Sequence, residues 1–177
     1  MSYTVSSRTA CVPVPEFLKD CVDVEKFLGY CRKCPNYGAV WACPPLSVDP
    51  MQIWNAYDLL ELHARVLTPG ADMDMNRLLE AFRREKIDLS RQVLELEQRT
   101  PGSLSMAAGT CLACRVCARR EGKPCRHPEQ VRFSIEALGG DVGRITEKYL
   151  ELPICWMQNG QLPPYLTLVA GLLLRKS

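Results

Sequence analysis

The chain has 177 residues, a formal net charge of +2 and 47% hydrophobic residues. This size suits one globular domain that buries about 70% of its unfolded surface, and it excludes a large multidomain assembly. The balanced charge argues against intrinsic disorder and against a generally basic surface for nucleic acid. The 10 Cys and 13 Pro are high for this length, whereas there are only 2 His. We therefore expect a single metal-binding domain, residues 1–177, whose chemistry is carried by sulfur.

Two segments of the sequence bear on the cellular location of the protein. Residues 1–15 lack a basic start followed by an apolar run, so no secretory signal is predicted. The longest apolar stretch, residues 165–174, is about half of the roughly 20 residues that a membrane helix needs. We expect a cytoplasmic protein with no membrane partner. In a reducing cytosol, this many cysteines favour metal ligation by thiolates over disulfides.

The first predicted elements lie in the Cys-free middle of the chain. A short helix is expected over residues 50–57, followed by a strand over 58–67, which Thr68-Pro69-Gly70 ends. A long helix is expected from the N-cap Asp74 to the break at Thr100-Pro101-Gly102. Its apolar residues recur at helical spacing: Met75, Leu78, Phe82, Leu89, Val93 and Leu96. We interpret the charged run Arg83-Arg84-Glu85-Lys86 as a solvated face and expect no nucleic-acid contact.

The remaining elements follow the second group of cysteines. A short strand is expected over 103–108, helices over 128–138 and 141–150, a turn over 160–164 and a closing strand over 165–174. This order predicts an α+β fold with a small, mainly antiparallel sheet and a long helix on one face. Two Cys-rich metal-binding loops would meet near one end of it.

The second Cys block carries the strongest chemical signal. Cys111, Cys114 and Cys117 are each separated by two residues, and Cys125 follows Pro124. Bacterial ferredoxins wrap such a run around an iron–sulfur cluster and place a further Cys next to Pro. A zinc site more often uses two separated Cys pairs. The spacing therefore favours a [4Fe-4S] cluster, with zinc and unligated thiols as the alternatives.

Basic residues surround this block. Arg115, Arg119 and Arg126, together with Arg120 and Lys123, are opposed only by Glu121. Guanidinium groups close to a cluster would stabilise its negative charge and raise its reduction potential. Alternatively, they would bind an anionic substrate or partner. His127 adjoins Cys125, and we expect it to be structural because four Cys already suffice.

The first Cys block predicts a second metal site. Cys31, Cys34 and Cys43 are clustered, and Pro44-Pro45 stiffens the chain after the third thiol. The fourth ligand stays open between Cys21, a Cys of the other block and no protein ligand at all. In the last case an iron would be free to bind substrate as a Lewis acid. Cys155 lies in an apolar segment and is expected to be a buried, small hydrophobic residue.

The chain resembles a prokaryotic family of uncharacterised, predicted metal-binding proteins that is common in anaerobes. The first matching signature is Cys31, Cys34, Tyr37-Gly38 and Trp41 to Pro45; the second runs from Cys111 to Pro128. The segment Ser134 to Gly139 also resembles a helix of that family, so the likeness extends from about Cys31 to Leu174. This resemblance implies metal binding by Cys and carries no reaction to transfer.

These observations favour an iron–sulfur protein with one or two [4Fe-4S] clusters, acting in electron transfer or as accessory to a partner enzyme. Its expected partner is a redox or acceptor protein, and a spare sheet edge would permit a homodimer. The first alternative is an enzyme that uses an open-site cluster on a small anionic or sulfur-containing substrate, steered by Arg32 and Lys33. The second alternative is a zinc-stabilised interaction module. No nucleic-acid partner is expected.

Overall fold

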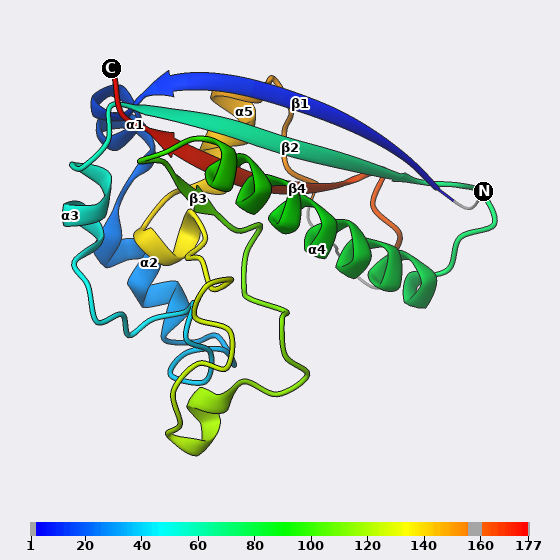
Figure 1. Ribbon diagram of the computed structural model, residues 1–177. Helices are drawn as coiled ribbons and strands as arrows, with labels where there is room; N and C mark the ends of the chain where they lie inside the picture. Colours follow the sequence, from blue (N-terminus) through cyan, green and yellow to red (C-terminus); the bar gives the residue numbers. More distant parts are fainter. Residues whose placement is uncertain (1–2, 156–160, 177) are drawn as a thin grey trace.

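The frame of the protein is a four-stranded antiparallel sheet, shown in Figure 1. The computed structural model describes residues 3–155 and 161–176. The strand order is β1-β2-β4-β3, with bounds β1 (Tyr3–Pro13), β2 (Leu59–Pro69), β3 (Leu104–Met106) and β4 (Leu166–Leu174). Strands β2, β3 and β4 form where the sequence predicts strands. The α+β class and the antiparallel sheet are confirmed.

The central strand β4 is apolar on both faces, whereas β2 carries Glu61, His63 and Arg65 on one of its faces. Successive side chains of a strand point to opposite sides of a sheet. Leu62 and Val169 accordingly belong to one hydrophobic core, whereas Leu168 and Ala170 belong to a second. The sheet therefore needs a covering layer on each face, which explains why β4 is a nearly continuous apolar run.

The long helix α4 (Met75–Arg99) covers one face of the sheet. Its N-cap is Asp74, as expected, and the carboxylate accepts a hydrogen bond from the backbone N–H of Arg77. Leu78, Leu89 and Val93 point into the core beneath the helix. The predicted helix and its apolar stripe are thus confirmed.

The opposite face is covered by shorter helices. These are α1 (Val14–Cys21), α2 (Val24–Cys31), α3 (Pro50–Trp54) and α5 (Val142–Leu150), with the short 3-10 turn η2 (Glu136–Leu138). Another 3-10 turn, η1 (Ala118–Glu121), lies apart from the sheet, in the loop of the second Cys block. The fully buried Trp54 packs against Phe17, with the ring centroids 5.1 Å apart. Its indole N–H donates to the carbonyl of Leu138 over 2.9 Å, which fastens η2 to this core.

The helix predicted over residues 128–138 is wrong, because only η2 forms there. The backbone N–H of Ala107 donates to Phe133, and Ala107 also pairs with Ser134 in an isolated parallel bridge. The guanidinium of Arg132 is held by the Glu97 carboxylate of α4. These long-range contacts hold the segment extended, so local helical spacing does not decide its conformation.

The N-terminal elements β1, α1 and α2 were not predicted. Most of β1 is exposed and polar, so it has no apolar alternation, yet it pairs with β2 along its full length from Tyr3 to Pro13. Pro15 at the start of α1 suits a first helical turn. The predicted turn over 160–164 begins with Gly160, which lies outside the described residues.

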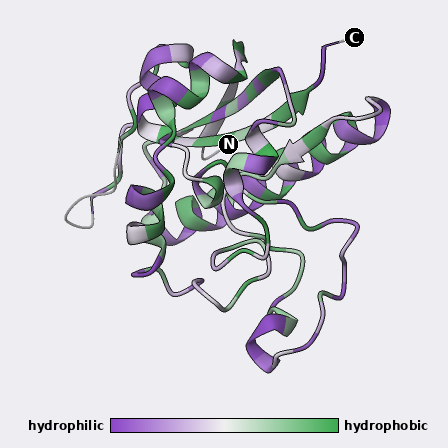
Figure 2. Ribbon diagram, turned by 90° about the vertical axis from the view of Figure 1, so that its left-hand side faces the viewer, coloured by the Kyte–Doolittle hydropathy of each residue, from purple (hydrophilic) through white to green (hydrophobic). Residues whose placement is uncertain are grey.

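Both Cys-rich segments leave the sheet and lie side by side in an irregular lobe beneath α2 and α4 (Figure 1). Figure 2 shows hydrophilic residues at the tip of this lobe, where η1 lies. Throughout residues 3–155 and 161–176, every helix is too short or too polar for a bilayer crossing. The described residues place the two Cys-rich loops on a sheet-based scaffold.

Candidate metal centre

The second Cys block surrounds one small cavity. Its wall contains all four predicted thiols, together with Val40, Trp41, Ala113, His127 and Val131, and its volume is about 20 Å³. Burial raises the pKa of the Cys111 thiol, and the nearby charges of Cys125, Cys117 and Cys114 raise it further. The fold thus brings Cys111, Cys114, Cys117 and Cys125 together, as their spacing suggested.

The backbone of this loop is held by its own polar groups. Gly122 adopts a left-handed φ of 66° after η1, a conformation that glycine reaches without strain. Arg126 donates to the carbonyl of Val116 over 2.9 Å. At His127 it is the backbone N–H that faces the Cys125 sulfur, at 3.4 Å, while the imidazole lies 3.9 Å from the Glu129 carboxylate.

The first Cys block forms a second group of thiols at the end of α2. Backbone N–H groups of Cys34 and Cys43 donate to carbonyls three residues earlier, which makes a series of tight turns. Gly38, with φ of 66°, donates to Pro44 over 2.8 Å and closes the loop. Burial raises the pKa of Cys31, and the charges of Cys43 and Cys34 raise it further. These three thiols therefore share one electrostatic environment.

Cys21 does not join this group. It is only 2% exposed at the end of α1 and belongs to the hydrophobic core. Burial raises its pKa, and the charged groups that act on it are Arg144, Lys148, Asp20 and Asp141, with no other cysteine among them. The structure thus places Cys21 against α5, away from Cys31.

The other two cysteines lie elsewhere. Cys11 is exposed on β1, and Cys155 is partly buried in a cavity wall next to the described end at residue 155.

Arg119 joins the two blocks. Its guanidinium donates to the carbonyls of Val40, Cys43 and Pro45 over 2.9, 2.7 and 2.7 Å. The same guanidinium lies 4.9 Å from the centroid of the Trp41 ring, a cation–π geometry. Trp41 in turn donates its indole N–H to Lys123 over 3.0 Å. Of the predicted arginines, Arg119 thus binds the first loop, Arg126 its own loop, and Arg115 is exposed.

The two blocks meet where Cys43 approaches Thr110. The thiol and the hydroxyl are hydrogen-bonded at 3.2 Å, and the charges of Cys43 and Cys111 act on each other. Lys86 of α4 lies close to this contact between the two blocks. Its charge interacts with both thiols and with Glu136. We call Cys43, Thr110, Cys111, Lys86 and Glu136 the junction.

Two junction residues, Lys86 and Glu136, were missed by sequence reasoning. Lys86 sits in the charged run of α4, yet it follows the apolar Phe82 by four residues and precedes Leu89 by three. That spacing puts it on the buried face of the helix. Glu136 is flanked by buried Ile135 and Ala137. An isolated charge on an apolar face was the available signal in both cases.

Burial changes the pKa values at the junction. It lowers the pKa of Lys86 and raises that of Glu136, because each charged form loses hydration. One Glu136 oxygen, Oε2, is buried without a hydrogen-bond partner among the described residues. Uncompensated buried polar groups of this kind are uncommon in folded proteins.

The donor chemistry of both blocks fits a thiolate-bound metal group. Seven thiols converge in the lobe, with His127 beside the second group: Cys31, Cys34, Cys43, Cys111, Cys114, Cys117 and Cys125. Over the described ranges, no three Cys, His, Asp or Glu side chains stand close enough to grip one metal ion. The cavity of about 20 Å³ has room for roughly one water, so loading a larger group requires the thiols to move outwards.

A sheet scaffold carrying two groups of neighbouring thiols in irregular loops defines a Cys-rich, metal-binding class of protein. The chain belongs to the family of predicted metal-binding proteins called DUF2284, whose profile matches residues 18–174. This match confirms the resemblance seen in the two Cys signatures and covers both thiol groups. No curated protein and no solved structure matches the chain.

Proposed function

We propose that the protein is a cysteine-ligated iron–sulfur protein that transfers electrons to, or serves as accessory to, a partner enzyme. The observation that carries this proposal is the convergence of Cys111, Cys114, Cys117 and Cys125 on one cavity. Thiolates spaced by two residues suit separate irons of a [4Fe-4S] cluster. The irregular loop around them can widen without disturbing the sheet.

The first block supports a second cluster. Cys31, Cys34 and Cys43 supply three thiolates, and Cys111 adjoins Cys43 across the junction. Adjacent metal groups would allow an electron to pass from one block to the other. The neighbouring Arg119 and Lys86 supply positive charge that favours a thiolate-rich, reduced site.

The decisive experiment is the iron, inorganic sulfide and zinc content of protein purified without oxygen, together with its absorption spectrum. Two [4Fe-4S] clusters require about eight irons per chain, and one cluster requires about four. Zinc without sulfide would overturn the proposal and support a zinc-stabilised interaction module, since structural zinc binds thiolates without sulfide.

A matched pair of variants tests the ligands. Cys114→Ser is expected to lose the iron of one whole cluster, because a hydroxyl is a poor iron ligand. Cys11→Ser is the control, since Cys11 is exposed on β1. Unchanged iron and absorbance in Cys114→Ser would refute the assignment of the second block.

An enzyme with an open-site cluster is the second candidate function. Cys21 lies in the core, so the first block has three near thiols, and a cavity of about 650 Å³ opens beside Lys86 and Glu136. When bound, such a cluster supplies Lewis-acid chemistry at the iron without a protein ligand. The residues of the chain would bind and orient a small anionic substrate. Spectroscopic change of the purified iron protein on adding ligand separates this candidate from electron transfer alone.

A further inference from the structure

A second candidate binding site, which does not depend on metal, is a cavity next to the sheet. A cavity of about 650 Å³ lies between α2, α4, η2 and β4, within the usual size of small-molecule sites, about 300–1,000 Å³. Its walls are largely apolar, with Phe27 and Tyr30 from α2, Phe82 from α4 and Leu168 from β4. A cavity of this kind would bind the hydrophobic body of a ligand.

One charged side chain in this wall lacks a partner. Lys86 makes no hydrogen bond or ion pair within the described part of the chain. Glu136 also reaches the wall, but its carboxyl accepts a hydrogen bond from Ser134, and its other oxygen, Oε2, is closed off from the cavity by burial. The remaining charged pair of the wall, Lys26 and Asp141, forms an ion pair at 3.7 Å. The cavity thus offers one unpaired cation.

The backbone around Lys86 preserves this arrangement. Gly109 has a φ of +72°, and a Cβ there would lie 3.1 Å from the Lys86 Nζ atom. Glycine therefore leaves the space that the ammonium group occupies.

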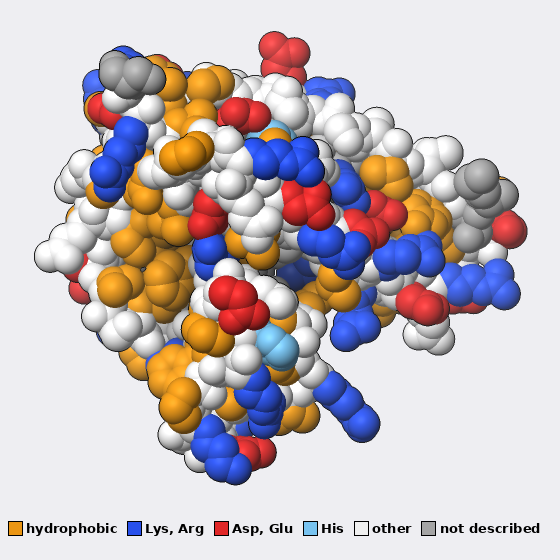
Figure 3. Space-filling model, viewed as in Figure 1, with side chains coloured by type: hydrophobic (Ala, Val, Ile, Leu, Met, Phe, Trp, Pro, Cys, Tyr) orange, Lys and Arg blue, Asp and Glu red, His pale blue; other side chains and the backbone are white. Residues whose placement is uncertain are grey.

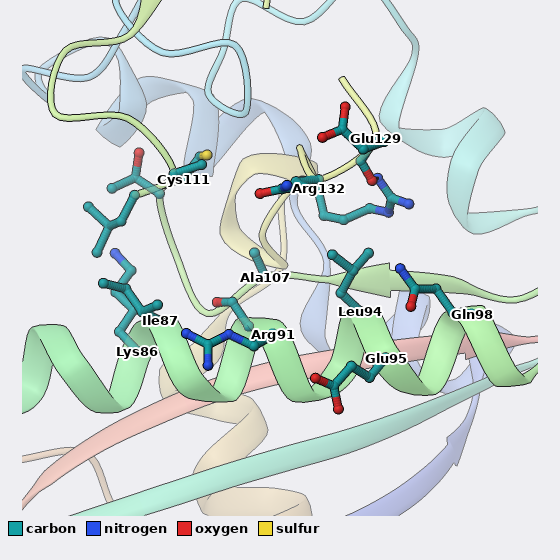
Figure 4. A pocket seen from close by; sticks show the side chains of 15 residues that line it. Lys86, Ile87, Arg91, Leu94, Glu95, Gln98, Ala107, Cys111, Glu129 and Arg132 are labelled. Atoms are coloured by element: carbon teal, nitrogen blue, oxygen red, sulfur yellow. The ribbon is translucent and has the colours of Figure 1, made fainter. Parts of the chain in front are cut away.

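Lys86 also lines a neighbouring cavity of about 500 Å³ with Cys111 and Arg91, which Figure 4 shows between α4 and the Cys loop. Figure 3 shows Lys and Arg side chains gathered along α4 and on the lobe. A ligand that is itself anionic would be drawn to this region.

We infer that the cavity binds a small carboxylic acid that has an apolar body. The carboxylate accepts hydrogen bonds from Lys86, and the body packs against Phe27 and Phe82. This inference goes beyond the proposed iron–sulfur function, because Lys86 is not a metal ligand in it.

A pair of probes tests the charged contact by calorimetric titration. The probes are 3-phenylpropanoate and the neutral 3-phenylpropanamide, which share the same apolar body. The amide is expected to bind at least about tenfold more weakly than 3-phenylpropanoate.

Variants then locate the binding. Lys86→Met is expected to remove the preference for 3-phenylpropanoate over the amide. Lys19→Met is the control, because Lys19 is exposed and does not line the cavity. Circular dichroism of each variant establishes that it is folded.

Measuring ligand binding both with and without bound metal separates this inference from the iron–sulfur proposal. The titration is made on protein purified without oxygen and again after chelation, with iron and zinc measured in both samples. Binding in both samples supports the inference even where the iron–sulfur proposal fails. Absence of 3-phenylpropanoate binding overturns it, and so does binding that Lys86→Met leaves unchanged.

Discussion

The guanidinium of Arg119 donates a hydrogen bond of 2.7 Å to the backbone carbonyl of Cys43. Arg119 follows the third thiol of the second block, whereas Cys43 is the last thiol of the first. One side chain thus connects two segments that are far apart in the sequence. Because the carbonyls of Val40 and Pro45 share the same guanidinium, its removal leaves three acceptors without this donor.

Arg119→Gln is therefore expected to loosen the first thiol group while the second keeps its metal. The loss of a charged donor to several carbonyls should cost about 2–3 kcal/mol of stability. Metal analysis and thermal unfolding measure both effects. Arg120→Gln is the control, since Arg120 is exposed on the same short turn. Equal metal loss from both blocks in Arg119→Gln would contradict this role.

Cys21→Ala is expected to retain the metal of the first block. The thiol is buried in the core, and its removal should cost about 1–3 kcal/mol through the small cavity it leaves. Cys34→Ala is the matched comparison, because Cys34 is exposed and its charge acts on Cys31 and Cys43. Iron content and denaturant titration should separate the two variants. Metal loss in Cys21→Ala comparable to that in Cys34→Ala would make Cys21 a ligand.

Gly139→Ala is expected to damage the first metal site from a distance. Gly139 has a φ of +88°, and a Cβ there would lie 2.7 Å from the Val24 backbone at the start of α2. Helix α2 ends at Cys31, so a shift of the helix would displace that thiol. We expect a loss of at least about 2 kcal/mol in stability, with reduced first-block metal.

The control for this variant is Gly102→Ala. Gly102 has a similar φ of +78° but no atom within 4 Å of a Cβ, so that variant carries backbone strain alone. Its cost should be about 1 kcal/mol, with metal content unchanged. Equal effects of the two substitutions would exclude the clash with Val24 as the cause.

Glu97 makes the free energy of unfolding depend on pH in a defined direction. Burial raises the pKa of this carboxyl, but hydrogen bonds from Arg132 and Ser105 outweigh burial and hold the pKa below its ordinary value of 4.5. A carboxyl with a lowered folded-state pKa stabilises the fold fully above its ordinary pKa, and this stability is lost as the pH falls through the folded-state pKa.

Glu97→Gln is consequently expected to lose about 2 kcal/mol at pH 7, because Arg132 loses its charged partner. Urea unfolding of the variant and of the unaltered protein should differ most at neutral pH. The difference should shrink as the pH falls below 4.5, because the unfolded chain binds a proton at Glu97 there and the folded carboxyl is protonated only at its lower pKa. A difference that is constant from pH 7 to pH 3 would show that the ionised form is not the stabilising one. Glu95→Gln is the control, since Glu95 makes only an exposed contact at 3.9 Å with Arg99.

Local patterns in the sequence predicted the structural features that depend only on neighbouring residues. The N-cap Asp74, the apolar spacing of α4 and the run of β4 depend on neighbouring residues, and each is observed. The grouping of Cys111, Cys114 and Cys117 follows in the same way from their short spacing.

Relationships set by tertiary packing were not predictable in this way. The exposed strand β1 has no alternating pattern because its partner β2 alone specifies it. The extended segment near Arg132 depends on Glu97, a residue of another element. Cys21 was one of three options for the fourth ligand of the first block, and the packing of α1 against α5 decides where its thiol lies. The junction of Lys86 with Glu136 likewise exists only after folding.

Strand β4 lies between β2 and β3, yet it follows both Cys blocks in the chain. A ribosome adds about 5–20 residues per second, so the thiols are synthesised seconds before Leu166. During that interval the sheet lacks the strand that joins its two parts. Both Cys blocks are therefore complete in the chain before the strand that joins the two parts of their scaffold has been made.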